Sequence, residues 1–372
     1  MGIYDAIRIL QHAGELQKVE DGRCGDCAPV HVRLELTETC NFRCRFCWWH
    51  IPELRRELRG LRHENRMMPR ERALSLVDEL ADAGTRAISF TGTGDPLMFP
   101  HLAEVLQRLV ARGIVFGLTS NFAVPLGDAL LALLARASWL RVSLNAGTPT
   151  VYERIHQPQG KAPHKAFPRM EDNVRRLTAL LAQRGDGPDF NASFVVSKDN
   201  REDIFPAARL ARELGLASIA FRADTPPRRQ ATPYAYRPED LAAMERATAE
   251  LQTDRFQVHP GLVRQLDGVI SGDPELCCYY SNHTTYIDPR GDVYPCCYAR
   301  CDAKYILGNI LEQPFSDFWH SDARQNRYKT LLQDACPPCS YGRCNQALKC
   351  LYQKELGVND ILVVRDQPDP FI

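Results

Sequence analysis

The distribution of cysteine is the feature that most limits what this chain can fold into. The 372 residues contain 14 cysteines, five of them between Cys24 and Cys47 and nine between Cys277 and Cys350. None falls in the 229 residues that separate the two groups, and random placement would leave such a gap with a probability on the order of one in a million. Disulfide frameworks belong mainly to short secreted chains, so the grouping indicates ligands of a metal or an iron–sulfur cluster.

The composition is that of an ordinary globular protein. Lys+Arg and Asp+Glu both number 46, 44% of the residues are hydrophobic, and the sequence pI is near 7.1. This balance argues against a protein that mainly binds nucleic acid. The longest apolar stretch, Ala129–Ala135, is far shorter than the ~20 residues of a membrane span, and residues 1–20 show no secretory signal. We therefore expect a cytoplasmic protein of more than one unit, without a nucleic-acid or membrane partner.

The first compact motif is Cys40, Cys44 and Cys47, with the spacing C-x3-C-x2-C. It directly follows residues 31–37, whose alternating apolar side chains predict a strand. Zinc sites usually take four ligands in two separated pairs, whereas a four-iron cluster held by three thiolates keeps one iron open for a substrate or cofactor. We expect such an open cluster; the alternative is a zinc site that takes a distant fourth ligand.

The motif, with the aromatic Phe46 before its last cysteine, resembles that of the radical S-adenosylmethionine (radical SAM) enzymes. The resemblance implies that the open iron of a [4Fe-4S] cluster binds the amino and carboxylate groups of SAM, and that Phe46 packs near the adenine. An electron, from a donor of the flavodoxin or ferredoxin type, then splits SAM and produces a 5′-deoxyadenosyl radical. This chemistry makes the chain an enzyme.

The middle of the chain alternates strand-like and helical patterns, as expected of βα units around a parallel sheet. The fold class is α/β, and the pattern matches the partial (β/α)6 TIM-like barrel of the family, followed by a small cysteine-rich module. The predicted strands are 31–37, 86–90, 114–119, 139–145, 190–196 and 217–222, and the predicted helices are 69–83, 101–112, 128–136, 170–183 and 201–214.

Polar residues follow the predicted strands at the edge where functional residues of such sheets lie. The segment Thr91–Pro96 stands where the family usually has Gly-Gly-Glu-Pro, a segment that binds the SAM amino group. A strand-to-helix turn that needs Gly94 and Pro96 is the alternative for this segment, and any of the other residues could be a polar strand cap. The resemblance implies cofactor contacts by Phe46, Thr93, Gly94, Asp95, Pro96, Ser120, Ser143, Asn145 and Arg222, with Ser193 as a further candidate.

The second cysteine group resembles the SPASM/twitch modules of radical SAM enzymes, although its final spacing departs from the full SPASM pattern. Cys278, Gly291 and Cys296 have the family's spacing around a predicted hairpin, in which residues 286–287 pair with 293–294. The resemblance implies at least one auxiliary [4Fe-4S] cluster, and a zinc ribbon is the alternative. The expected ligands are Cys278, Cys296, Cys336 and Cys339, with a second cluster open to Cys344, Cys350 and either Cys301 or Cys277.

The expected organisation has five parts. Residues 1–27 form a helical segment and a loop with Cys24 and Cys27, to which no role is assigned. The other parts are the barrel (28–225), a linker with a helix (226–269), the auxiliary cluster module (270–352) and a tail (353–372).

Three functions remain open. The favoured one is an oxidoreductase of dehydrogenase type that takes a hydrogen atom from a small natural-product precursor, as in antibiotic biosynthesis: a sugar, aminocyclitol or nucleoside. An auxiliary cluster would accept the second electron. The second is a peptide- or protein-modifying enzyme, set lower because only 39 residues precede Cys40, or a redox-neutral epimerase or decarboxylase. The third is an electron carrier without SAM chemistry. Trp48, Trp49 and His50 could border the substrate, and His156 is expected to be a core or surface histidine.

Overall fold

The computed structural model describes residues 8–50, 66–185, 189–224, 235–260, 278–300, 302–333, 341–363, 369 and 371. Its centre is one ten-stranded sheet with the strand order β10-β9-β8-β1-β2-β3-β4-β5-β6-β7. Neighbouring strands from β8 through β1 to β7 are parallel, and β9 and β10 continue the sheet in antiparallel fashion. The strands are β1 (His31–Leu34), β2 (Ala87–Phe90), β3 (Val115–Ser120), β4 (Trp139–Ser143), β5 (Asp189–Val196), β6 (Ser218–Ala223), β7 (Gln257–Pro260), β8 (Thr284–Ile287), β9 (Asp292–Tyr294) and β10 (Gly308–Asn309).

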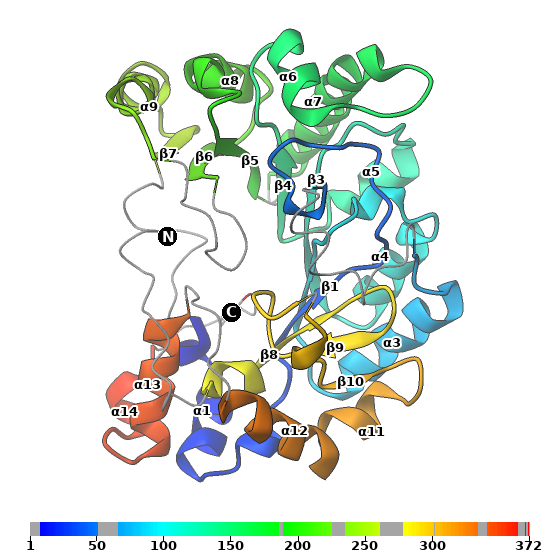
Figure 1. The fold of residues 1–372 in the computed structure, drawn as a ribbon, viewed down its shortest axis with the longest axis vertical. Helices are drawn as coiled ribbons and strands as arrows, with labels where there is room; N and C mark the ends of the chain where they lie inside the picture. The colour runs from blue at the N-terminus through cyan, green and yellow to red at the C-terminus, as the bar shows by residue number, and fades with distance from the viewer. Residues whose placement is uncertain are drawn as a thin grey trace.

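Helices cover the outer face of the curved sheet, as Figure 1 shows for α3 through α9. Each follows a strand and turns its apolar stripe toward the sheet, because a βα unit can bury that stripe only there. These helices are α3 (Arg70–Asp82), α4 (Leu102–Ala111), α5 (Asp128–Leu134), α6 (Pro149–His156), α7 (Ala166–Arg184), α8 (Ile204–Glu213) and α9 (Pro238–Leu251).

The two faces of the strands differ in chemistry because successive side chains point to opposite sides. Val32 and Leu34 of β1 are fully buried in the main hydrophobic core beneath the helices. Arg33, between them, points to the inner face, where Ser89 of β2 is its register partner. An inner face lined with polar groups suits a barrel that holds a polar ligand better than one filled by packing.

The sequence predicted the six central strands and their five helices, and each is present within a few residues. The partial barrel of the α/β class is therefore confirmed. The other four strands, β7 to β10, were not predicted as parts of this sheet, although β8 and β9 were predicted as a hairpin. β7 has a single core residue, Val258, and β8 joins the sheet only through its pairing with β1, some 250 residues away.

The auxiliary module begins with the β8–β9 hairpin, which the sequence also predicted, and the described chain continues through β10 and helices α11 to α14. The helices are α11 (Phe315–Trp319), α12 (Asp322–Gln333), α13 (Gly342–Tyr352) and α14 (Val358–Ile361). The N-terminal helix α1 (Ala13–Glu20) packs against α13 and α14 (Figure 1). Leu16 of α1 and Leu348 of α13 lie fully buried in a second hydrophobic core. The two ends of the chain thus fold together.

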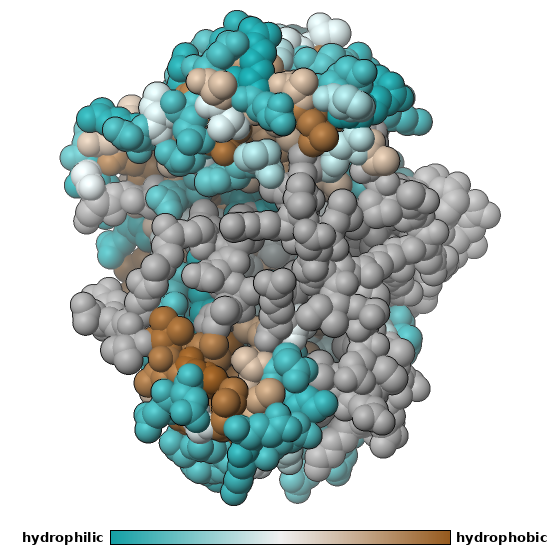
Figure 2. Space-filling model, turned by 90° about the vertical axis from the view of Figure 1, so that its left-hand side faces the viewer, coloured by the Kyte–Doolittle hydropathy of each residue, from teal (hydrophilic) through white to brown (hydrophobic). Residues whose placement is uncertain are grey.

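The described helices include none that is long and apolar enough to cross a bilayer. Figure 2 shows hydrophilic side chains over the upper part of its face and a patch of apolar surface lower down. The exposed apolar side chains of the C-terminal segment include Tyr352, Leu356 and Val363.

Candidate active site

The cluster loop, residues 40–47, lies against the end of α6. The backbone N–H groups of Arg43 and Arg45 donate to the carbonyls of His156 and Ile155, at 3.1 and 2.9 Å. Two segments far apart in the sequence therefore fix the backbone on which all three cysteines stand.

His156 ties the loop to strand β4 through both of its ring nitrogens. Its Nε2 lies 2.9 Å from the carbonyl oxygen of Leu144, and its Nδ1 lies 3.0 Å from Cys44 Sγ. Because a carbonyl can only accept, Nε2 carries the proton and Nδ1 faces the thiol. Burial lowers the pKa of His156 to about 4, so the ring is neutral near pH 7. His156 was expected to be a core or a surface histidine, and the structure places it in the core. The sequence contained no indication of its contact with Cys44.

The three thiols of the loop are close enough to affect one another's ionisation. Burial raises the pKa of Cys40 to about 12, with further contributions from Asp95 and Cys47. Burial, followed by the charges of Cys47 and Cys40, also raises the pKa of Cys44. A bound metal removes this penalty, because coordination deprotonates a thiol outright. Three half-buried thiols on one braced loop therefore fit an iron–sulfur cluster that keeps one iron open.

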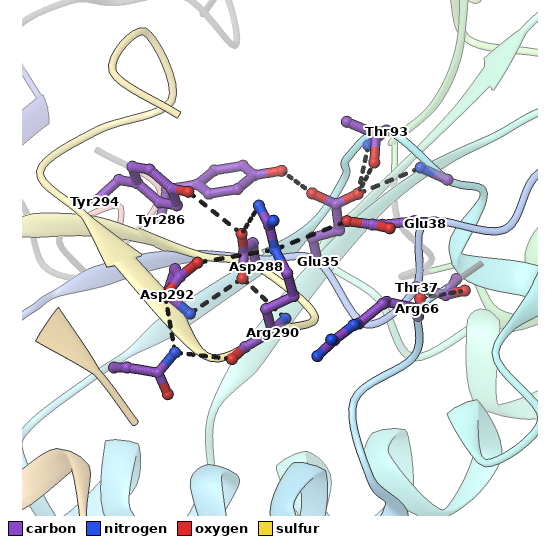
Figure 3. Close-up of polar contacts among 12 residues, drawn as sticks. Glu35, Thr37, Glu38, Arg66, Thr93, Tyr286, Asp288, Arg290, Asp292 and Tyr294 are labelled. Carbon is purple, nitrogen blue, oxygen red and sulfur yellow. Dashed lines mark hydrogen bonds and ion pairs between the residues drawn. The ribbon is translucent and has the colours of Figure 1, made fainter. Parts of the chain in front are cut away.

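Glu35, directly after β1, holds the segment predicted to contact SAM. Its Oε1 accepts hydrogen bonds from the backbone N–H groups of Thr93 and Gly94, at 2.7 and 3.3 Å, and from the Thr93 hydroxyl. Its Oε2 accepts the hydroxyl of Tyr286, from β8, at 2.5 Å (Figure 3). Sequence reasoning did not single out Glu35. The sequence offered one clue to this role: a charged residue directly follows the core residue Leu34, so its side chain is expected on the inner face of the sheet.

Asp95 is fully engaged with its own surroundings. Its Oδ1 accepts from the Ser120 hydroxyl (2.8 Å) and the Leu97 N–H (3.0 Å), and its Oδ2 accepts from the same hydroxyl (2.9 Å) and the Asn121 N–H (2.8 Å). Burial raises its pKa, and the hydrogen bonds lower it. Asp95 and Ser120 therefore brace the ends of β2 and β3 against each other. Pro96 begins the short 3-10 turn that Asp95 caps.

Gly94 is required by a close approach of two loops. A Cβ at this position would lie 2.2 Å from the carbonyl oxygen of Thr37 and 2.6 Å from that of Thr39. Real Cβ atoms do not approach backbone oxygens so closely. The segment after β1 and the loop after β2 thus lie in contact just before Cys40.

The hairpin of the auxiliary module reaches the same region (Figure 3). Asp288 accepts from the backbone N–H groups of Arg290 and Asp292 and, at 3.2 Å, from the Arg290 guanidinium. Glu38 lies 4.0 Å from Arg290 Nε, and its Oε2 has no hydrogen-bond partner among the described residues. Burial raises the pKa of Glu38 to about 7, although Arg290 lowers it. Barrel and module therefore meet through charged groups beside the cluster loop.

Strands β4, β5 and β6 place further predicted residues on the inner face. Ser143 and Ser193 are register partners, and Arg222 pairs with Val195 one row above. Burial lowers the pKa of Arg222, and nearby Tyr298 of the module raises it. Asn145 is different: its side-chain oxygen accepts the Val195 N–H at 2.7 Å, and its φ of 53° lies in the left-handed region. Its amide oxygen thus holds the end of β5.

Phe46 and the residues after Cys47 complete the surroundings of the cluster loop. Phe46 makes an edge contact with His156, with a ring-centroid distance of 6.1 Å. Trp49 is buried and His50 half-buried, while the side chain of Trp48 lies outside the described part.

The auxiliary cysteines are described in part. Cys277, Cys301, Cys336 and Cys339 lie outside the described residues; of the others, Cys296 and Cys344 are buried and Cys278, Cys297 and Cys350 are half-buried. Burial raises the pKa of Tyr280, Arg33 lowers it, and the thiols of Cys344 and Cys297 raise it further, which places both thiols near this ring. The sequence analysis did not propose Cys297. Cys344 and Cys350 lie six residues apart on α13, about 9 Å along its axis and on different sides. Their joint ligation of a cluster stays a prediction.

This combination defines an iron–sulfur protein built on a parallel barrel, and comparisons with known proteins give its family. Residues 34–180 match the model of the radical SAM superfamily, and residues 277–345 match that of an iron–sulfur cluster-binding domain, SPASM. The chain belongs to the radical SAM superfamily and carries a C-terminal SPASM module. The radical SAM domain implies a [4Fe-4S] cluster and SAM, and the SPASM module implies auxiliary iron–sulfur clusters.

Individual relatives are distant. The chain is 25% identical over 345 residues to the mycofactocin maturase MftC of Mycolicibacterium smegmatis, a match that covers 87% of this chain and 78% of that protein. It is 23% identical to the PqqA peptide cyclase of Streptomyces rochei, in a match that covers 84% of this chain and 82% of that protein. A nucleotide dehydratase of Flammeovirga pacifica is 25% identical but matches only 31% of this chain and 38% of that protein.

A solved structure agrees in fold. SuiB of Streptococcus suis, bound to S-adenosylmethionine, superposes with a TM-score of 0.56 at 16% identity, over 84% of this chain and 72% of that one.

Proposed function

We propose that this chain is a radical SAM enzyme that modifies a peptide. The observation that carries the proposal is the extent of the matches. The mycofactocin maturase and the PqqA peptide cyclase align over 87% and 84% of the chain, whereas the nucleotide dehydratase aligns over 31%. This order reverses the expectation from the sequence, which favoured a small natural-product precursor because few residues precede Cys40.

The chain's own residues have distinct tasks in this proposal. Cys40, Cys44 and Cys47 would hold the cluster, which together with SAM supplies a radical able to abstract a hydrogen atom from carbon. The carboxylate oxygens of Glu35 and Asp95 accept hydrogen bonds that fix residues 91–96 in place. The backbone of that segment would then contact the amino group of SAM, and the Asp95 carboxylate would act through it.

The test compares two panels of substrates with the anaerobically reconstituted enzyme, SAM and a reductant. One panel holds peptides encoded by short reading frames beside the gene, and the other holds sugars, aminocyclitols and nucleosides. We expect a peptide to carry deuterium into 5′-deoxyadenosine when its side chains are deuterated. A product lighter by two hydrogens marks oxidation or cross-linking, and an unchanged mass with deuterium from heavy water marks epimerisation. Turnover confined to the small molecules would refute the proposal.

A further inference from the structure

Cys24 and Cys27 form a pair to which the sequence assigns no role, apart from the cysteines expected to hold the radical SAM and auxiliary clusters. They flank the short 3-10 turn Cys24–Asp26, and the Cys27 N–H lies 3.3 Å from the Cys24 carbonyl oxygen. Cys27 is 1% exposed, and the charge of the Cys24 thiol, three residues before it, contributes to raising its pKa. A C-x2-C turn of this kind is the usual first half of a structural zinc site.

His283, more than 250 residues further along the chain, lies near Cys27. It lies between the 3-10 turn Tyr279–Asn282 and β8, and it is 0% exposed. Neither ring nitrogen has a hydrogen-bond partner in the part of the chain that the structure describes. An unsatisfied buried polar group costs about 1–3 kcal/mol, so an imidazole in this state indicates a ligand that the side chains alone do not supply.

Glu15 of α1 completes the group. Its Oε2 lies 3.8 Å from His283 Nδ1, and one ligand atom each of Glu15, Cys27 and His283 lie within 4.8 Å of one another. Tetrahedral zinc with bonds of about 2.0–2.3 Å separates its ligand atoms by roughly 3.3–3.8 Å, so a small contraction brings the three into range. Backbone groups already orient the site: the Ala28 N–H donates to Glu15 Oε2 at 2.9 Å, and Trp319 Nε1 donates to the Cys27 carbonyl at 2.9 Å.

We propose that Glu15, Cys24, Cys27 and His283 bind a structural Zn²⁺ that joins the N-terminal segment to the SPASM module. Two thiolates, one carboxylate and Zn²⁺ sum to one negative charge, and Lys18 Nζ, 2.8 Å from Glu15 Oε1, offsets it. This mixed donor set suits zinc, whereas iron–sulfur clusters are held mainly by four thiolates. The metal would link α1, which carries Glu15, to the start of β8, which follows His283.

The ionisation states agree with this assignment. Burial lowers the pKa of His283 to about 4, so its imidazole is neutral and able to coordinate near pH 7. Burial raises the pKa of Cys27, a penalty that a bound cation removes because it takes the thiol as thiolate.

The test is zinc analysis of the anaerobically reconstituted holoenzyme after incubation with Zn²⁺ and desalting. We expect about one zinc per chain, and zinc-edge X-ray absorption with two sulfur neighbours near 2.3 Å and two lighter neighbours near 2.0 Å. Because this absorption edge is specific to zinc, the iron–sulfur clusters do not interfere.

Three variants locate the metal. Cys27→Ser and His283→Gln should each lower the zinc content at least about tenfold while the iron content stays unchanged, and His164→Gln, on an exposed turn, should change neither. Wild-type protein without zinc, a Cys24–Cys27 disulfide in the holoenzyme, or zinc retained in both ligand variants would each overturn the proposal. If a variant does not fold, the sulfur count of the wild-type spectrum still decides. The proposed peptide substrate is unaffected by either outcome.

Discussion

Glu35 shows how a single buried carboxylate can set the geometry of a cofactor site. It is 3% exposed and accepts hydrogen bonds from the loop after β2 and from Tyr286 of the SPASM module. Hydrogen bonds to a charged group contribute about 1.5–3 kcal/mol each, and a buried donor left without an acceptor costs a similar amount. Glu35 therefore couples the SAM-binding segment to the auxiliary module.

Replacing Glu35 by Ala should destabilise the holoenzyme by about 2 kcal/mol, because the N–H groups of Thr93 and Gly94 would lose their buried acceptor. Thermal unfolding measures the change, and Glu153→Ala, at an exposed position of α6, is the matched control. An E35A variant as stable as the wild type would contradict the role given to this carboxylate.

His156 offers a second test at this scale. Removing its imidazole in His156→Ala takes away the contacts with Cys44 Sγ and the Leu144 carbonyl, so the cluster loop loses its brace. We expect production of 5′-deoxyadenosine to fall at least about tenfold, as is usual when a group that orients a metal ligand is lost. The auxiliary clusters should keep their iron. His164→Ala should leave both measurements unchanged, and full activity of H156A would refute this role.

Asp288 predicts a dependence of stability on pH. Burial raises its pKa from 3.8 to about 6, so between these values the folded protein holds a proton that the unfolded chain has released. The free energy of unfolding contributed by this group is fully present below about pH 4 and falls as pH rises toward 6, by about 3 kcal/mol in all. Asp288→Asn should flatten this part of the profile of melting temperature against pH. An identical slope in the variant would count against the assignment.

At the scale of elements, the site is made by loops that pack on one another after β1 and β2. Gly94→Ala would drive a Cβ into the carbonyls of Thr37 and Thr39, backbone atoms that cannot rotate away. We expect a loss of about 3 kcal/mol and a lower iron content at the cluster loop. In Gly14→Ala the new Cβ meets nothing within 4 Å inside α1, so this control should gain up to about 1 kcal/mol. Equal melting temperatures would contradict the close approach.

Much of this element-level organisation was predictable. The strands β1 to β6 have alternating or continuous apolar runs of ordinary length, and the cysteine spacing identified the cluster loop directly. The partners of individual side chains were not predictable, because Glu35 and Thr93 are 58 residues apart and His156 and Cys44 are 112 apart. Such pairings depend on which loops come together in the folded chain, and local sequence patterns do not predict this.

At the scale of the whole molecule, the SPASM module continues the barrel sheet through the pairing of β8 with β1. Phe371, the residue before the last, also lies against the barrel, where its ring meets His31 and Trp139 edge-on at 5.5 and 5.8 Å. Asp369 forms an ion pair with Arg8 at 2.8 Å. The sequence could not reveal these long-range contacts, because neither end of the chain has a pattern that specifies a partner. The barrel, the module and the described residues near both ends therefore pack together.

The central claim is that the cluster loop holds an iron–sulfur cluster able to split SAM. Its most direct test is the formation of 5′-deoxyadenosine by the reduced holoenzyme, compared with a variant in which Cys40, Cys44 and Cys47 are all alanine. The account predicts steady formation by the wild type, none by the variant, and a loss of about four irons per chain with the auxiliary iron kept. Undiminished 5′-deoxyadenosine in the variant, or none from wild-type protein with a full iron content, would contradict it.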